Sequence, residues 1–144
     1  MTPKLIDSLY TEAMVLADEA RSYFDREGRD ERMTLDPLLR VGFSCESLKV
    51  TTRLMHVIAW LLTQRAVEAG ELTIAQSRTP ARKLGDASES DAILLGKLPE
   101  GALAIVRASQ ELYARVKRLE EGSATPEPQA SPARSLMSRL ERAF

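Results

Sequence analysis

The sequence predicts an all-α protein: a three-helix bundle with a long central helix, followed by a short C-terminal tail. Three long segments repeat apolar residues with the period of an α-helix, and residues that favour helix starts and stops flank them. Only 5% of the residues are aromatic, so the core must be aliphatic. With 144 residues, the chain can form one domain whose core needs no disulfide or metal. We expect the bundle to span residues 1–122 and the tail to span residues 123–144.

The first helix is expected to begin after Thr2, a candidate N-cap that Pro3 follows, and to stop at Gly28. At 100° per residue, its apolar side chains fall within an arc of about 140°. Most of its acidic residues fall outside that arc, so the pattern predicts an amphipathic helix with one buried face. The apolar residues are Leu5, Ile6, Leu9, Tyr10, Ala13, Leu16, Ala17, Ala20, Tyr23 and Phe24.

The second helix is expected to begin at Asp36-Pro37 and to run to about Ala69, before Gly70. Its apolar residues cover an arc of about 200°, whereas a helix with one buried side needs little more than about 100°. Two explanations stay open. The helix either lies centrally between two neighbours or also buries a face against another chain. The candidate dimer interface consists of Leu54, Ile58, Leu61 and Leu62.

The third helix is expected from Pro99 to Glu121, with Gly122 as its stop. Ile105, Leu112 and Leu119 repeat every seven residues, as in the seam of a helical bundle. The residues that flank this seam are Ala102, Val106, Ser109, Tyr113 and Val116.

Residues 71–98 read as a long connection. Pro80, Gly85, Gly96 and the polar stretch 86–91 interrupt its apolar residues, so we expect only one or two short helical turns. A connection of this length inside a compact domain usually has a role or is mobile.

The tail has two parts. Residues 123–132 contain three prolines and no large apolar residue, which predicts a flexible linker. On a helix, the apolar residues of 133–144 fall within an arc of about 100°. Either this segment docks on its own bundle as a last helix, or it folds on a partner. Its candidate partner-binding residues are Leu136, Met137, Leu140 and Phe144.

Composition and spacing argue against most kinds of catalytic or charged site. The 20 basic and 21 acidic residues leave a net charge of −1, which is untypical of proteins that coat nucleic acid or an anionic membrane. Cys45 and His56 are the single residues of their types, and about 16 Å separates them along one helix. Phosphate-loop, nucleophile-elbow and metalloprotease motifs are absent. We therefore expect no enzyme, no catalytic residue, no metal and no cofactor.

The sequence also predicts a cytoplasmic protein without membrane insertion. The N-terminus lacks the basic and apolar regions of a secretory signal. The longest apolar run, residues 57–62, is far shorter than the roughly 20 residues that span a bilayer.

A second candidate surface lies on the polar side of the central helix. Trp60, the only tryptophan, lies there within reach of Arg53 and His56, so that Arg53 could stack on its ring. Trp60 and Arg53 are residue types that are enriched at binding hot spots. Two interpretations stay open: Trp60 covers the edge of a wide core or packs in a dimer, or the cluster binds a different protein. The candidate partner-binding residues are Lys49, Arg53, Trp60 and Gln64.

Residues 43–67 of this helix resemble the signature of the RcdA family, the regulators of CtrA degradation in alphaproteobacteria. The pieces S-x-E-S, T-T-R-L-M and W-L-L-x-Q-R-A-V occur in order and without gaps. A weaker similarity covers the first helix, residues 111–116 and residues 139–144.

The resemblance implies a three-helix bundle that forms a homodimer and carries a poorly ordered C-terminal tail. It also implies a non-enzymatic adaptor that delivers cell-cycle regulators to the ClpXP protease, with recruitment to the cell pole. Its partners would be ClpXP, a response-regulator primer (CpdR), and a further adaptor that carries the transcription factor CtrA as cargo. The alternative hypothesis is a dimeric helical interaction module that regulates another transcription or signalling complex. Nucleic acid is not an expected partner under either hypothesis.

Overall fold

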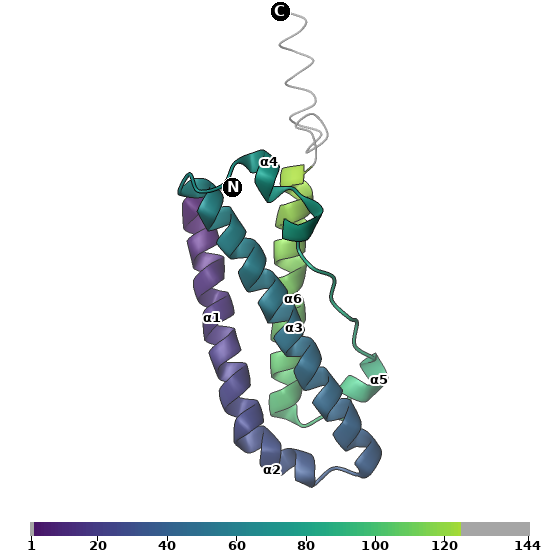
Figure 1. The fold of residues 1–144 in the computed structure, drawn as a ribbon. Helices are drawn as coiled ribbons and strands as arrows, with labels where there is room; N and C mark the ends of the chain where they lie inside the picture. The colour runs from purple at the N-terminus through teal and green to yellow at the C-terminus, as the bar shows by residue number, and fades with distance from the viewer. Residues whose placement is uncertain (1, 125–144) are drawn as a thin grey trace, which may run out of the picture.

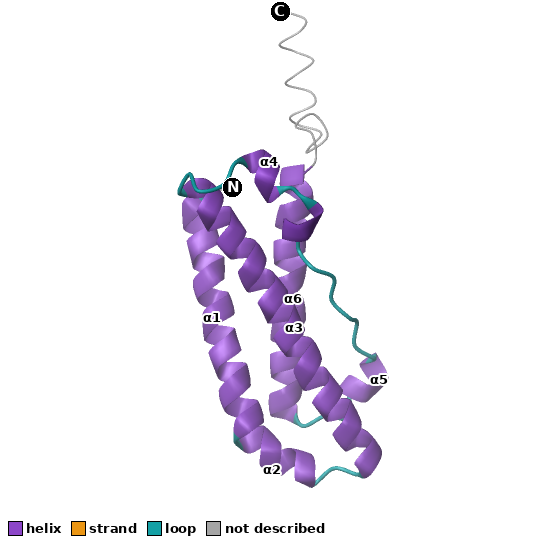
Figure 2. Cartoon of the chain, viewed as in Figure 1, coloured by secondary structure: helices purple, strands orange, loops and turns teal. Residues whose placement is uncertain are grey.

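The computed structural model describes residues 2–124, which form a bundle of three long helices (Figures 1 and 2). The long helices are α1 (Pro3–Asp25), α3 (Pro37–Glu68) and α6 (Glu100–Ala124). The central helix α3 packs against both α1 and α6, which also contact each other. Residues 2–124 contain no strand, so the predicted all-α fold class is confirmed.

Side-chain caps fix the starts of α1 and α3, as the sequence predicted. The Thr2 Oγ1 accepts a hydrogen bond of 3.2 Å from the Leu5 amide, and Asp36 Oδ1 accepts one of 2.9 Å from the Leu39 amide. In each case the next residue is a proline, whose missing N–H costs nothing at this position. α3 ends as expected before Gly70, which has a φ of +78° that disfavours other residues.

The expected stop of the first helix at Gly28 is wrong. α1 ends at Asp25, and α2 (Glu27–Met33) then carries the chain across the end of the bundle (Figure 1). Gly28 lies inside α2 for a packing reason: a Cβ atom there would lie 2.9 Å from the ring of Tyr23. The Tyr23 hydroxyl donates to the Glu31 carboxylate, and burial together with this acceptor raises the pKa of Tyr23 well above its ordinary range.

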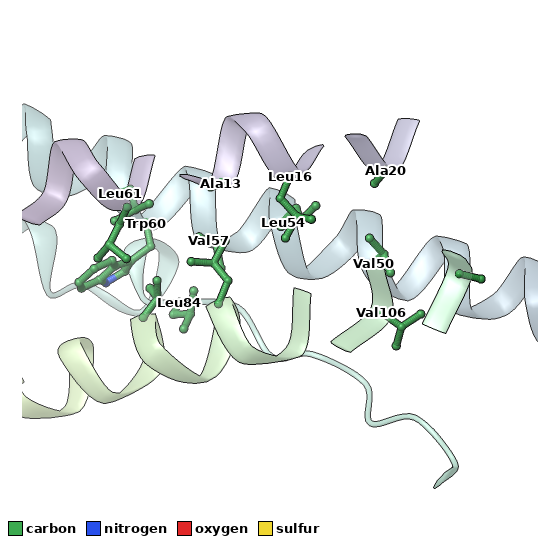
Figure 3. Close-up of a cluster of buried hydrophobic side chains, with 14 of the residues drawn as sticks. Ala13, Leu16, Ala20, Val50, Leu54, Val57, Trp60, Leu61, Leu84 and Val106 are labelled. Carbon is green, nitrogen blue, oxygen red and sulfur yellow. The ribbon is translucent and has the colours of Figure 1, made fainter. Parts of the chain in front are cut away.

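The core lies between the three long helices (Figure 3). α1 contributes residues spaced three and four apart, which is the apolar face that the sequence predicted. Two seam residues of α6, Ile105 and Leu119, are only partly buried. The buried face of α6 is instead centred on fully buried residues such as Val106, Ser109 and Val116. α6 also continues through Gly122 to Ala124, two residues beyond the expected stop. The fully buried residues of α6 are Ala102, Val106, Ser109, Leu112 and Val116.

The connection between α3 and α6 contains only short helical turns, as expected. They are α4 (Ile74–Ser77), η1 (Pro80–Arg82) and α5 (Ala92–Leu95). Hydrogen bonds to α6 hold its middle part: the Tyr113 hydroxyl donates to the Gly85 carbonyl at 2.6 Å, and the Leu84 amide donates to Glu120 at 2.6 Å. The predicted linker from residue 125 onward and the segment 133–144 lie outside the described residues.

Substitution of Leu61 by alanine is expected to lower the free energy of unfolding by about 2–5 kcal/mol, because it leaves a cavity in the core. Leu61 is fully buried, whereas Leu38 on the same helix is 82% exposed. Leu38→Ala is the matched control and should cost under about 0.5 kcal/mol. Urea unfolding followed by circular dichroism measures both, and equal costs would contradict the position of the core.

Candidate functional site

The polar side of α3, which the sequence offered as a partner-binding surface, is covered by the connection. Arg53 is only 2% exposed, and its guanidinium holds three groups at once. Nη2 donates to the Ser88 carbonyl and to Ser90 Oγ, both at 2.9 Å, and Nη1 donates to Ser109 Oγ at 3.3 Å. One side chain therefore ties α3 to the connection and to α6.

Glu46, which lies about two turns before Arg53 on α3, completes this buried network. Its side chain is 1% exposed and forms an ion pair with Lys49 at 3.0 Å. Ser90 donates its hydroxyl to the Glu46 carboxylate, and Lys49 Nζ donates to the Glu89 carbonyl at 2.9 Å. Burial lowers the pKa of Arg53, and the nearby Glu46 carboxylate acts in the opposite direction.

Trp60 is buried, which agrees with the interpretation that it covers the edge of a wide core. Trp60 is 4% exposed and belongs to the core cluster, together with Leu84 from the connection (Figure 3). At the level of His56, the connection lies so close that a Cβ atom on Gly85 would come within 2.6 Å of the imidazole ring. The guanidinium of Arg53 donates to serine oxygens. On the same helix, Arg65 forms a cation–π pair with Tyr10, at 4.6 Å from the centre of its ring.

The serine-rich stretch 86–91 is the partner that sequence reasoning missed. The sequence predicts only an interruption of the connection here, yet Arg53 donates to the Ser88 carbonyl and to the Ser90 hydroxyl of this stretch. The signal in the sequence is the spacing of Glu46, Lys49 and Arg53, which places three charged side chains on one face of a helix. None of the predicted helices was expected to supply hydrogen-bond partners for them.

Part of the expected dimer interface is also wrong in position. Leu54 is 3% exposed and Leu61 fully buried, because both point into the core of their own chain. Ile58 is partly buried against the same core, and Leu62 is 46% exposed. Of the four candidates, only Leu62 therefore presents a large part of its side chain to a second molecule.

An open apolar stripe runs along the outer side of α3. Its large residues repeat every seven positions, and a second row of small residues lies between them, three or four positions from each. The large residues are Val41, Leu48, Met55 and Leu62, which are 61%, 68%, 63% and 46% exposed. The small residues are Cys45, Thr52, Ala59 and Ala66, of which the first three are exposed. We call these eight residues the outer stripe.

A groove of about 790 Å³ lies at the end of the bundle where α1 begins and α3 and α6 end. Its apolar wall contains Ile6, Trp60, Val67 and Ile74, and Gln64 lies beside them. Ile74 is 59% exposed and Val67 is partly exposed, whereas Ile6 and Trp60 are buried, so the accessible part of the wall lies at Val67 and Ile74. Charged residues from four elements surround it: Asp7, Arg65, Glu68, Arg78, Lys83, Glu120 and Glu121.

The only cysteine and the only histidine of the chain differ in exposure. Cys45 is exposed on the outer stripe, whereas the connection packs on His56. Within residues 2–124, no three His, Cys, Asp or Glu side chains lie close enough to hold a metal ion. Over the same residues, no helix combines the length and apolar character that crossing a membrane requires.

Comparison with known proteins places this arrangement in a family. All of the chain, residues 1–144, matches the family described as "Protein of unknown function (DUF1465)". The chain belongs to the DUF1465 family. It also matches the crystal structure of RcdA from Caulobacter crescentus CB15, with 33% sequence identity and a TM-score of 0.66. That match covers 83% of this chain and 90% of the RcdA chain.

This DUF1465 protein is therefore RcdA-like, which confirms the resemblance that residues 43–67 suggested. Neither match names a catalytic activity. The curated proteins contain no match.

Replacement of Arg53 by methionine is expected to cost about 3–5 kcal/mol of stability, because it removes the three buried hydrogen bonds of the guanidinium and leaves Lys49 as the cation beside the buried Glu46 carboxylate. The amides of residues 86–91 should also exchange faster with solvent, since the connection loses its anchor. Hydrogen exchange and urea unfolding of the variant measure the two effects.

Arg107→Met is the matched control, because Arg107 is exposed on α6. Adding Glu46→Met to Arg53→Met should recover part of the loss, since the buried carboxylate, which Arg53 no longer helps to stabilise, is then removed as well. A loss in Arg53→Met no larger than in Arg107→Met would contradict the role of the network.

Proposed function

We propose that this protein is a non-enzymatic adaptor that scaffolds the delivery of cell-cycle regulatory proteins, with a CtrA-like transcription factor as cargo, to the ClpXP protease. The likeness to RcdA over most of both chains is the observation that carries the proposal. In this proposal the partners are ClpXP with its response-regulator primer, a further adaptor and the cargo. The protein acts in the cytoplasm and is recruited to the cell pole.

The surfaces of the described residues support a binding role. An adaptor needs apolar surface that a partner can bury, and contiguous exposed apolar patches on a folded domain commonly mark such sites. The outer stripe of α3 supplies one, and the groove at the end of the bundle supplies another. Lys49 and Gln64 stay candidate contacts at the edges of the covered face, and Leu136, Met137, Leu140 and Phe144 stay candidate contacts of the tail.

The proposal includes a homodimer, and the outer stripe is the interface that we assign to it. The four large residues lie on one heptad position and the four small residues on another, which suits an antiparallel pair of α3 helices. With a two-fold axis between positions 53 and 54, every large residue faces a small residue of the second copy. The facing pairs are Val41 with Ala66, Leu48 with Ala59, Met55 with Thr52, and Leu62 with Cys45.

This self-complementarity favours a second copy over an unrelated helix. A two-fold interface uses the same patch on both subunits, so the patch must fit itself. Alternation of large and small side chains allows two helices to interdigitate closely along the roughly 38 Å from Val41 to Ala66. The exposed Leu62 of the earlier candidate set belongs to this interface, with Ile58 at its edge.

In a reconstituted assay with ClpXP, its primer and a CtrA-like cargo, the full-length protein should accelerate ATP-dependent degradation of the cargo. Deletion of residues 125–144 should abolish the acceleration, because it removes the candidate tail contacts and leaves α6 intact to Ala124. Ile93→Glu is the surface control, since Ile93 is 73% exposed on α5. No acceleration by the full-length protein with any candidate cargo would overturn the adaptor proposal, whereas full activity of the truncated protein would overturn only the role of the tail.

The dimer predicts a specific disulfide. Leu62→Cys should cross-link two copies under mild oxidation, because residue 62 faces Cys45 of the second copy in the antiparallel arrangement. The wild-type protein should not cross-link, since its two Cys45 residues lie 17 positions apart along the pair, or about 25 Å. Non-reducing electrophoresis and mass spectrometry detect the bond.

Leu48→Cys is the matched control on the same stripe. Its new thiol would lie about 16 Å from its counterpart and about 21 Å from Cys45 of the second copy. A parallel pair would instead cross-link both variants, Leu48→Cys at position 48 and Leu62→Cys at position 62, so the absence of a bond in Leu48→Cys distinguishes the antiparallel arrangement. Absence of cross-linking in Leu62→Cys, or a monomeric mass by light scattering at micromolar concentration, would contradict the assigned interface.

A further inference from the structure

The groove at the end of the bundle lies next to the point where the described chain ends. Glu120 and Glu121 belong to the last turns of α6 and form part of the groove wall, and α6 ends three residues later at Ala124. Figure 1 shows this end of α6 next to α4, at the same end of the bundle as the start of α1. The described part of the chain therefore ends at the edge of this apolar wall.

The sequence that follows has the length to reach this wall. Residues 125–132 form a connection of eight residues, for which a flexible chain has an end-to-end distance of about 16 Å. Residues 133–144 then carry four large apolar residues on one helical stripe, namely Leu136, Met137, Leu140 and Phe144. Such a short stripe needs a complementary apolar surface, because a helix of this length is marginal alone in water.

We propose that residues 133–144 bind in this groove of their own chain, with the apolar stripe against Ile6, Trp60, Val67 and Ile74. A volume of about 790 Å³ is in the range that accommodates several such side chains. The short tether favours the own chain over other occupants, because it gives a local concentration in the millimolar range. Even a weak intrinsic affinity then populates the bound state.

Charge contributes to the orientation of the segment more than to its affinity. Residues 133–144 carry three arginines and one glutamate, and the groove carries four acidic and three basic residues. One of the acidic residues, Asp7, already pairs with Arg65 at 3.3 Å. Since exposed ion pairs contribute little, burial of the apolar stripe provides most of the binding free energy.

Binding in the groove would also regulate the tail. The same four apolar residues are the tail contacts of the proposed adaptor, so the groove and an external partner would compete for them. This consequence rests on the proposed function, whereas binding in the groove does not. A spin-label NMR measurement detects binding in the groove alone, and its outcome is independent of any degradation assay.

Trp60 provides a unique probe, because it is the only tryptophan and its side chain forms part of the wall. A spin label on Ser138→Cys, in a Cys45→Ser background, lies off the apolar stripe. In the full-length protein this label should broaden the indole N–H signal of Trp60 in the nitrogen-15 NMR spectrum. A mixture of labelled unenriched protein and unlabelled enriched protein should show no broadening, since the contact is within one chain.

Ile74→Glu should abolish the broadening, because it places a charge in the wall at an exposed position. Ile93→Glu, an exposed isoleucine on α5, is the matched control and should leave it unchanged. Leu140→Ser tests the tail side without altering the bundle and should also abolish the effect.

Three results would overturn the proposal. The first is the absence of broadening in the otherwise unaltered chain, and the second is broadening that survives both Ile74→Glu and Leu140→Ser. The third is broadening that also appears in the mixed sample, which would show that the tail of a second copy occupies the groove.

Discussion

The structure depends on the burial of one charged side chain. Arg53 lies on the central helix, and its guanidinium reaches the connection and α6 together. A buried charge is costly unless hydrogen bonds and an opposite charge satisfy it, and Glu46 with the serines at 88, 90 and 109 meets that requirement. The connection is therefore held against the polar side of α3, where it also covers Trp60 with Leu84.

As a result, the side of α3 that the chain buries does not coincide with the apolar side of the helix. The apolar arc of the helix and the arc that the chain itself buries differ by about 90° around the axis. Polar residues such as Arg53 are consequently inside, and large apolar residues such as Leu48 and Met55 are outside. One part of the wide apolar arc thus packs between α1 and α6, which is the first of the two explanations that the sequence left open. The other part is exposed, and only the proposed dimer would bury it.

The sequence predicts what local interactions determine. The caps at Thr2 and Asp36, the three long helices and the end of α3 at Gly70 all follow from residues that are neighbours along the chain. What it did not predict depends on contacts between distant residues. Gly28 serves the packing of Tyr23, and Trp60 is buried because a connection 24 residues further along the chain packs on it. Only the structure shows that the serine-rich stretch is the partner of Arg53.

The two proposed binding surfaces can operate separately, because they use different sides of α3. Leu62 of the outer stripe and Gln64 of the groove are only two positions apart, yet a rotation of about 200° separates them on the helix. A second copy on the stripe would therefore leave the groove open to the tail. Dimerisation and tail binding need not exclude each other, so a partner that captures the tail could do so without first dissociating the dimer. If the cross-linked Leu62→Cys dimer lost the contact between residue 138 and Trp60, the two surfaces would be coupled, and α3 would have to transmit that coupling.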